Sequence, residues 1–353
     1  CGGDRVVMNP GSVYMIHEPM VSLLSANAAR LRTALDEQAA AAGARSLAAQ
    51  GVDAIAVVLL FSFLNPAHEQ RLAEIIAREA PSVDVSLSSR VLPQMREFPR
   101  LSTTVANARI SPMMGRYLAA LEGRLRGLDV TTEALYIMQS NGGVARIGSV
   151  TPVTTVLSGP CAGAIAGIEV AAAAGFDNVL TLDMGGTSTD IALGQAGRVL
   201  ETTTGRIGDW ELAVPMLMIN TIGAGGGTIA WLDGAGALQV GPNSAGADPG
   251  PVCYGKGGTE PTVTDANVVL GFLHPEYLLG GKVKTDRQAA SHAITEMGEQ
   301  IGLGPLQTAE GMVRIVNAKM EEGVREVSTE RGYDLRDFVL VAFGGAGPVH
   351  AAR

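Results

Sequence analysis

The sequence predicts an α/β fold arranged in two or three domains, and three observations support this. The 353 residues exceed the length of one ordinary domain. Segments with helical periodicity alternate with short apolar runs that are typical of buried strands. Hydrophobic residues make up 46% of the chain and charged residues 17%, while 45 glycines favour tight turns and close backbone packing. The chain can therefore form buried cores with many loops suited to ligands.

Helices and strands alternate in the amino-terminal part. The apolar run 54–64 (AIAVVLLFSFL) is too short to span a membrane and stops at Asn65-Pro66, so it favours a buried strand. A long helix follows at 100–126, with Pro112 as a kink or break. No element is predicted in residues 1–33, which lack clear periodicity. The other predicted elements here are helices at 36–50 and 67–79 and strands at 53–63, 83–88 and 135–139.

The carboxyl-terminal part contains two strands that each lead into a glycine-rich loop. The mostly small residues at 160–174 allow a helix to pack very close to a sheet or another helix. The two strands are expected at 179–183 and 338–343, and an amphipathic helix at 308–331 precedes the second. A hairpin is expected over 191–193 and 198–201. We divide the chain into an unassigned segment (1–33), an amino-terminal α/β lobe (34–150) and a loop-bearing domain (151–353).

Charge and cysteine content exclude several functional classes. The net charge is −9 and no Lys/Arg-rich run occurs, which argues against nucleic acid as a partner. The three cysteines, Cys1, Cys161 and Cys253, are far apart and form no CxxC pair, so neither a disulfide framework nor a zinc knuckle is indicated. No membrane span or signal peptide is recognisable, and a reducing cytoplasm is the expected compartment. The first residue is Cys1 and not Met, which indicates a fragment or a processed chain.

The first glycine loop carries the most specific pattern for phosphate binding. Asp183-Met184-Gly185-Gly186-Thr187-Ser188-Thr189-Asp190 directly follows the apolar strand VLTLD. Two glycines let backbone N–H groups approach a phosphate, and three hydroxyl side chains add donors. Asp183 is placed to hold a magnesium ion through water, and Asp190 could do the same or cap a turn. A simple hairpin turn is the alternative, but the whole octet favours phosphate binding.

Two further glycine loops are consistent with a nucleotide site. In 343–351 (FGGAGPVHA), the glycines Gly344, Gly345 and Gly347 would suit contact with a base and a ribose, with a helix starting near Pro348. In 222–228, Gly225 and Gly226 allow close backbone approach, and apolar residues on both sides argue against a flexible linker. Of the histidines, only His350 lies in such a loop and is worth testing.

A fourth stretch contains acidic candidates for catalysis. Asp248 and Asp265 are potential ligands or acid/base groups, in 246–255 and 262–267 respectively. Asp265 is equally well interpreted as a helix N-cap. Cys253 could be a nucleophile, although a small buried side chain is the favoured interpretation.

Together these motifs resemble the hydantoinase A / 5-oxoprolinase family. The resemblance covers about Asp36 to the end, and it is most specific over 157–273, where LSGPCAGAIAG, IGAGGGTIAW and SAGADPGPVCYGKGGTEPTVTDANVVLGFL occur in family order. DMGGTSTD and FGGAGPVHA are similar to the phosphate and adenosine loops of the actin-like ATPase (ribonuclease H-like) fold. The resemblance therefore implies actin-like ATPase lobes, here truncated at both ends, with 151–353 as the ATPase domain.

The resemblance also implies a reaction. In this family ATP, with Mg²⁺, phosphorylates the amide oxygen of a small cyclic amide such as a hydantoin or 5-oxoproline, and water then opens the ring. Asp183, Gly185, Gly186, Thr187 and Thr189 would contact phosphate or magnesium, with Ser188 beside them, and Gly344, Gly345 and Gly347 would contact adenosine. A hydantoinase B-like partner subunit and an oligomeric assembly are implied as well.

Other functions share these loops. Related enzymes include ATP-dependent ketone carboxylases, and bicarbonate dependence distinguishes them. A small-molecule kinase of the same fold should lack the stretch SAGADPGPVCYGKGG, and a nucleotide-gated binding protein would bind ATP without opening a ring. The family's earlier DxGGTxTD loop is missing here. We therefore expect weak nucleotide binding, and little or no turnover, from these residues alone.

Overall fold

A computed structural model describes residues 13–16, 34–130, 134–207, 210–278, 281 and 284–352. The chain forms two compact units. Unit 1 contains the chain up to Ser158 and a return segment, Glu201–Met216. Unit 2 contains Gly159–Leu200 and Leu217–Arg353. Two short strands, β9 (Glu201–Thr202) and β12 (Met216–Leu217), lie where the chain passes from one unit to the other.

Unit 1 is built on a parallel sheet with helices on both faces. Its strands are β1 (Val13–Ile16), β2 (Ala54–Val57) and β3 (Asp84–Leu87), in the order β1-β2-β3. Along β2, Ile55 and Val57 pack with the apolar core shared by α1 and α2, whereas Ala54 and Ala56 pack against α4. This alternation follows from the two-residue period of a strand. The helices are α1 (Glu37–Ala49), α2 (Ala67–Glu79), the short α3 (Ser88–Val91) and the long α4 (Glu97–Arg126).

Two buried charged residues, Glu69 and Arg100, bind the backbone just after strand β2. The Glu69 carboxylate accepts hydrogen bonds from the Leu59 N–H at 2.9 Å and from the Ser88 hydroxyl at 2.6 Å. Arg100, from α4, donates to the Leu59 carbonyl at 2.8 Å and to Ser62 at 2.6 Å. Because these side chains take both backbone groups of Leu59, the predicted strand 53–63 was too long, and the chain turns after Val57 instead.

Two hairpins complete unit 1. β4 (Tyr136–Met138) pairs with β5 (Val144–Arg146), and β10 (Gly205–Ile207) pairs with β11 (Trp210–Leu212). The second hairpin is held to α4, because the Ser102 hydroxyl donates to the Glu211 carbonyl at 2.7 Å and the Ala213 N–H donates to Thr103 at 3.0 Å.

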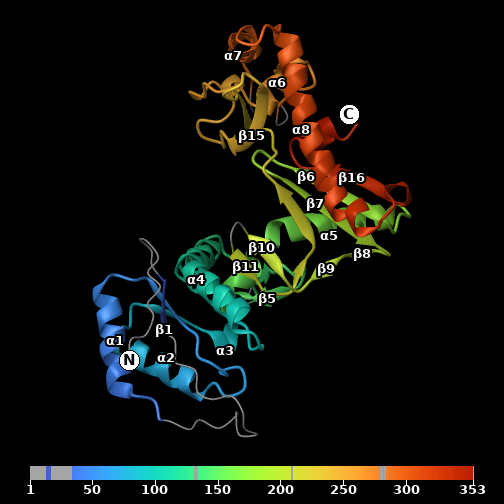
Figure 1. Ribbon diagram of the computed structural model, residues 1–353. Helices are drawn as coiled ribbons and strands as arrows, with labels where there is room; N and C mark the ends of the chain where they lie inside the picture. The colour runs from blue at the N-terminus through green and yellow to red at the C-terminus, as the bar shows by residue number, and fades with distance from the viewer. Residues whose placement is uncertain are drawn as a thin grey trace. The chain divides into compact units, whose positions relative to one another are not determined.

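Unit 2 contains a mixed sheet in the order β13-β7-β6-β16, with β8 paired to β7 (Figure 1). β7 (Thr189–Gln195) pairs antiparallel with β6 (Val179–Met184) on one side and with β13 (Ile219–Ile222) on the other. β16 (Val339–Phe343) runs parallel to β6, so both strands end at the same edge. That edge therefore carries the two predicted glycine loops side by side. β8 (Arg198–Val199) is shorter than predicted.

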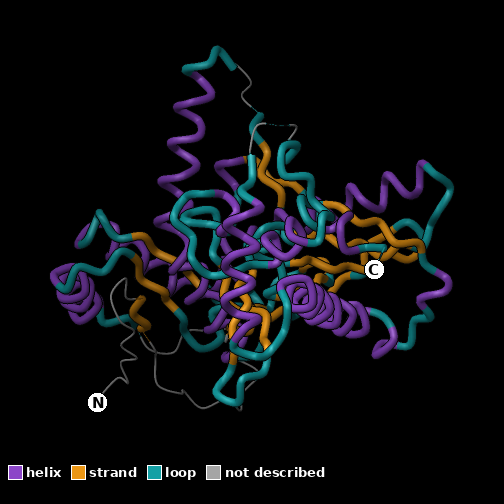
Figure 2. Tube along the Cα trace, turned by 90° about the horizontal axis from the view of Figure 1, so that it is seen from above, coloured by secondary structure: helices purple, strands orange, loops and turns teal. Residues whose placement is uncertain are grey.

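Two helices cover the faces of this sheet. Leu180, Ile191 and Leu193 form a core with Val324 and Val327 of α8 (Pro305–Val327). On the other face lies α5 (Ser158–Ala173), whose Gly167 is so close that an added Cβ would sit 2.9 Å from the Thr181 side chain. The small residues of 160–174 thus serve the close packing that the sequence predicts. Figure 2 shows all strands of the chain in orange and all helices in purple.

A second layer of unit 2 packs against α8. It consists of the hairpin β14 (Thr228–Leu232) and β15 (Leu238–Ser244) with α6 (Val263–Val269) and α7 (Arg287–Glu299). Their shared core includes Ala230, Val268, Ile294, Met312 and Val316. The chain then continues through β16 to the short helix α9 (Gly347–His350).

Most predicted helices are confirmed, including 67–79 without change and a helix near Pro348. Pro112 does not break α4, which is continuous from Glu97 to Arg126. Residues 1–12 and 17–33 lie outside the described residues, and β1 was not predicted. Within the described part of the chain, none of the helices has the length and apolar character needed to cross a membrane.

Candidate nucleotide site

The first glycine loop connects two adjacent strands and brings two carboxylates together. Asp183 near the end of β6 is directly opposite Asp190 near the start of β7 in the antiparallel register. The Gly185 N–H donates to the Ser188 carbonyl at 3.0 Å and closes the turn. Gly186 and Thr187 at its tip are exposed. The turn therefore offers backbone N–H groups beside a pair of acidic side chains.

The two carboxylates are held in an environment that disfavours their charge. Burial raises the pKa of Asp183, and the neighbouring charge of Asp190 raises it further. Burial also raises the pKa of Asp190, while a hydrogen bond from the Thr221 hydroxyl at 2.5 Å acts in the opposite direction. A bound cation would relieve both the burial and the repulsion, because it stabilises the charged carboxylates.

The loop 222–228 lies against the back of the first loop. The N–H groups of Gly226 and Gly227 donate to the carbonyls of Gly185 and Gly186 at 2.9 and 2.6 Å. A Cβ on Gly225 would sit 2.6 Å from the Thr187 nitrogen, so only glycine allows this approach. Gly225 and Gly226 are buried, and their backbone packs against the first glycine loop.

The third loop is fixed to the same strand end. Phe343 is paired with Asp183 in the parallel register of β16 and β6, and the Ala346 N–H donates to the Met184 carbonyl at 2.9 Å. Gly344 has a φ of +80°, and a Cβ there would sit 2.3 Å from an Asp183 carboxylate oxygen. Gly344 and Gly345 are exposed, whereas Gly347 is buried. The structure thus brings all three predicted glycine loops together.

Helix α6 holds the loop 222–228 in place through Thr264, a residue that was not predicted from the sequence. Thr264 donates twice to the Gly226 carbonyl, from its N–H at 2.7 Å and from its hydroxyl at 2.8 Å. The hydroxyl of Thr189 donates to the Ala224 carbonyl, so this predicted phosphate ligand is engaged within the protein. The only sequence signal for Thr264 was its place in the TVTDAN stretch, which drew attention to Asp265 instead.

Asp265 has a structural position. Its carboxylate is fully buried and accepts hydrogen bonds from the Thr262 N–H and hydroxyl, both at 2.8 Å, and from the Cys253 N–H at 2.7 Å. Thr262, and not Asp265, is the N-cap of α6, with Asp265 completing a capping box. Burial raises the pKa of the Cys253 thiol, and Asp265 raises it further, which fits the buried, unreactive interpretation of Cys253.

Asp248 makes no described contact with the three glycine loops. It is exposed in the loop after β15 and precedes a cis peptide bond to Pro249. No described contact joins it to Asp183 or Asp190.

The described residues also bear on how a metal could bind. None of the described His, Cys, Asp and Glu side chains gather in groups of three or more suited to a metal ion. Mg²⁺ nevertheless fits the Asp183–Asp190 pair, because it usually keeps several waters and takes one or two carboxylates together with phosphate oxygens.

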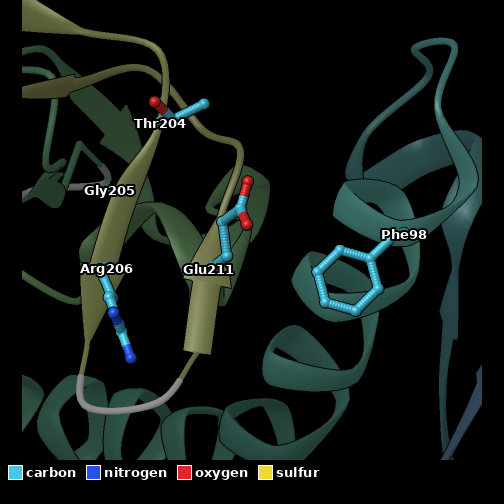
Figure 3. A pocket seen from close by; sticks show the side chains of 5 residues that line it. All are labelled: Phe98, Thr204, Gly205, Arg206 and Glu211. Carbon is cyan, nitrogen blue, oxygen red and sulfur yellow. The ribbon is translucent and has the colours of Figure 1, made fainter.

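A hollow of about 420 Å³ lies in unit 1, between the start of α4 and the β10–β11 hairpin (Figure 3). Phe98 projects from α4, while Arg206 and Glu211 extend in different directions from the hairpin (Figure 3). Thr204 and Gly205 complete the lining. The hollow belongs to unit 1, whereas all predicted site residues belong to unit 2.

Comparison with known proteins gives consistent matches over nearly the whole chain. The chain is 46% identical over 322 residues to caprolactamase subunit alpha of Pseudomonas jessenii. This match covers 90% of this chain and 46% of that protein. The crystal structure of an ATP-dependent caprolactamase from Pseudomonas jessenii matches with a TM-score of 0.75 and 44% identity, covering 94% of this chain and 48% of that one. The nucleotide-free structure of an acetone carboxylase matches with a TM-score of 0.81 and 30% identity, covering 90% of this chain and 45% of that one.

The chain thus spans about half the length of these relatives. The hydantoinase/oxoprolinase N-terminal region model matches residues 13–80, so the resemblance begins earlier than Asp36, where the sequence analysis placed it. The hydantoinase/oxoprolinase model itself matches residues 100–353. With its mixed α/β fold, the chain belongs to the hydantoinase/oxoprolinase family.

Proposed function

We propose that this chain supplies the nucleotide-binding part of an enzyme that uses ATP to open a cyclic amide. One observation carries the proposal: three glycine loops meet beside the Asp183–Asp190 pair, and glycine residues of two of them are exposed. Backbone N–H groups and a bound divalent cation are what a triphosphate requires. The compartment we propose is the cytoplasm, and the fold we propose for both lobes is that of actin-like ATPases.

The residues divide into two groups by exposure. Those that contact phosphate and its Mg²⁺ are Asp183 and Asp190 with the loop between them: the half-buried Gly185 and Ser188 and the exposed tip, Gly186 and Thr187. Gly344 and Gly345 contact the adenosine. A supporting group, made of Thr189, Gly225, Gly226 and Gly347, is buried and holds the loops together.

The chemistry follows from the weakness of an amide as an electrophile. The amide oxygen attacks the γ-phosphorus of ATP, and ADP leaves. Water then adds to the activated carbon, and the ring C–N bond breaks as the nitrogen takes up a proton, which leaves an acyl phosphate. A second water displaces inorganic phosphate from it to give the open amino acid. The exposed N–H groups of the loop stabilise the charge that develops on the phosphoryl oxygens. Mg²⁺ supplies further charge neutralisation when bound.

The caprolactamase similarity supports a lactam or hydantoin as substrate, and a partner subunit of the hydantoinase B type within an oligomer. A second function, ATP-dependent carboxylation of a ketone, is supported by the TM-score of 0.81 to acetone carboxylase. Turnover that depends on bicarbonate supports carboxylation. Turnover with a lactam in bicarbonate-free buffer supports ring opening.

The decisive experiment is calorimetric titration with Mg-ATP of the wild type and of Asp183→Ala. Binding that is lost in the variant supports the site at 183–190. Wild-type binding that the variant retains would place the phosphates elsewhere. Asp248→Ala is the matched control, because it removes an exposed carboxylate from the same unit.

A further inference from the structure

His350 links the third glycine loop, 343–347, to two helices of unit 2. It lies at the end of α9, three residues after this loop, and its side chain is buried. Ring atom Nδ1 is 2.7 Å from the Asn317 side-chain oxygen on α8. Ring atom Nε2 is 3.0 Å from the Asn267 side-chain nitrogen on α6. Three segments that are distant in sequence therefore meet at one imidazole.

The two contacts specify one form of the ring. The Asn317 oxygen only accepts hydrogen bonds, so Nδ1 must carry the hydrogen and donate. The Asn267 nitrogen only donates, so Nε2 must present its lone pair. These contacts are satisfied together only by the neutral imidazole with its hydrogen on Nδ1.

Asn267 and Thr264 lie on the same side of α6, because they are three residues apart. Thr264 binds the Gly226 carbonyl in the loop 222–228, and Asn267 binds His350 just after the loop 343–347. The other side-chain atom of Asn267, its oxygen, is buried and has no hydrogen-bond partner in the described part of the chain. Among the described residues, the bond to His350 is thus the contact that orients this amide.

We infer that His350, through the pair Asn267 and Asn317, is a positioning residue for the nucleotide's adenosine half. The hydrogen-bond chain fixes the loop 343–347 relative to α6, and α6 in turn supports the phosphate loop through Gly226. This inference rests on the proposed nucleotide site. His350 does not touch phosphate, so its effect is confined to the nucleoside part of the ligand.

The test compares Mg-ATP with Mg-tripolyphosphate, which lacks the nucleoside. His350→Phe keeps the bulk of the ring but removes both hydrogen bonds. We expect about tenfold weaker ATP binding, as for the loss of one or two ordinary hydrogen bonds, with unchanged tripolyphosphate affinity. His350→Gln keeps one donor and one acceptor and should recover most of the ATP affinity. His292→Phe, at an exposed position on α7, is the control.

Equal weakening of ATP and tripolyphosphate by His350→Phe would overturn the inference, since it would show general damage to the site. Unchanged ATP affinity would overturn it as well. If the wild type binds neither ligand, the proposed function fails, and the nucleotide role of His350 fails with it.

The ring form is tested without any nucleotide. Nitrogen NMR of the wild type should show His350 with a protonated Nδ1 and an unprotonated Nε2. Asn267→Asp replaces the donor by a carboxylate and should convert His350 to the imidazolium. A wild-type ring protonated on Nε2 would refute the hydrogen-bond chain, whatever the binding data show.

Discussion

Asp183 and Asp190 are paired directly across β6 and β7, and Asp183 lies against Gly163 of helix α5. Paired residues of antiparallel strands share a face, so both carboxylates are on the side that α5 covers. The pKa of each is raised, chiefly by burial. Without a cation, the sheet edge therefore holds two carboxylates in an unfavourable environment.

The first prediction concerns stability and pH. A carboxyl group whose pKa is higher in the folded than in the unfolded protein lowers the free energy of unfolding. This loss of stability is complete above the folded-state pKa and disappears below the unfolded-state pKa, which is about 3.8 for an aspartate. Asp183→Asn should therefore raise Tm in nucleotide-free protein at pH 8. The gain should shrink as the pH falls toward 4. Thermal denaturation at several pH values measures this, with Asp248→Asn as control, and a lower Tm of Asp183→Asn at pH 8 would contradict it.

The second prediction separates two adjacent glycines. Gly344→Ala places a Cβ 2.3 Å from the Asp183 carboxylate and forces an L-residue to a φ of +80°. It should lower Tm and abolish ATP binding. Gly345→Ala meets nothing within 4 Å, so Tm should not change. Its ATP affinity should still fall, because in the proposed site the nucleotide itself fills that space. Calorimetry and thermal denaturation of both variants test this, and full ATP affinity in Gly345→Ala would remove that residue from the site.

The third prediction concerns the supporting loop. Gly225→Ala would press a Cβ against the backbone of Gly186 and Thr187, at 2.7 and 2.6 Å. Because backbone atoms cannot rotate away, we expect a loss of about 1–3 kcal/mol of unfolding free energy, as for overpacking in a core. Gly234→Ala, in the β14–β15 turn, meets nothing within 4 Å and is the control. Denaturant unfolding that leaves both variants equal to wild type would exclude the close loop contact.

The sequence allowed the strand-to-loop junctions to be predicted because each is local: an apolar strand followed by glycines. The convergence of the loops was not predictable in the same way. It depends on β16 pairing with β6, more than 150 residues apart in the chain, and such long-range pairing leaves no local pattern. The role of Thr264 was missed for the same reason, since its partner Gly226 is 38 residues away. The predicted strand 53–63 failed because apolar character does not reveal that Glu69 and Arg100 occupy the Leu59 backbone.

The fourth prediction distinguishes structural from catalytic carboxylates. Asp265→Asn replaces an acceptor by an amide N–H₂ that faces the donors of Thr262 or Cys253. We expect a loss of about 1–3 kcal/mol of unfolding free energy. Turnover per folded molecule, assayed in the enzyme assembled with its proposed partner subunit, should be retained. Asp248→Asn, at an exposed position, should leave stability within about 0.5 kcal/mol of wild type. Urea unfolding and assays below the unfolding range test both, and an inactive but fully stable Asp265→Asn would show a catalytic role.

The last prediction concerns unit 1. Glu69 and Arg100 are both fully buried, and the hydroxyls of Ser62 and Ser88, 3.1 Å apart, connect them. Burial lowers the pKa of Arg100, while the negative charge of Glu69 opposes that shift. Glu69→Ala would leave the buried Arg100 with the half-exposed Glu97, 4.0 Å away, as its acidic neighbour. It would also leave the N–H groups of Leu59 and Ser89 without their acceptor. We expect a loss of about 3–5 kcal/mol, as for breaking a buried charge pair.

The matched control is the double variant Glu69→Leu/Arg100→Met, which removes both charges. It should recover part of the loss, because replacing a buried pair by apolar side chains of similar size is often close to neutral. Denaturant unfolding of the three proteins gives the coupling between the two sites. If the double variant were as unstable as the sum of its single variants, the two charges would act independently. The turn after β2 would then depend on the Leu59 hydrogen bonds alone.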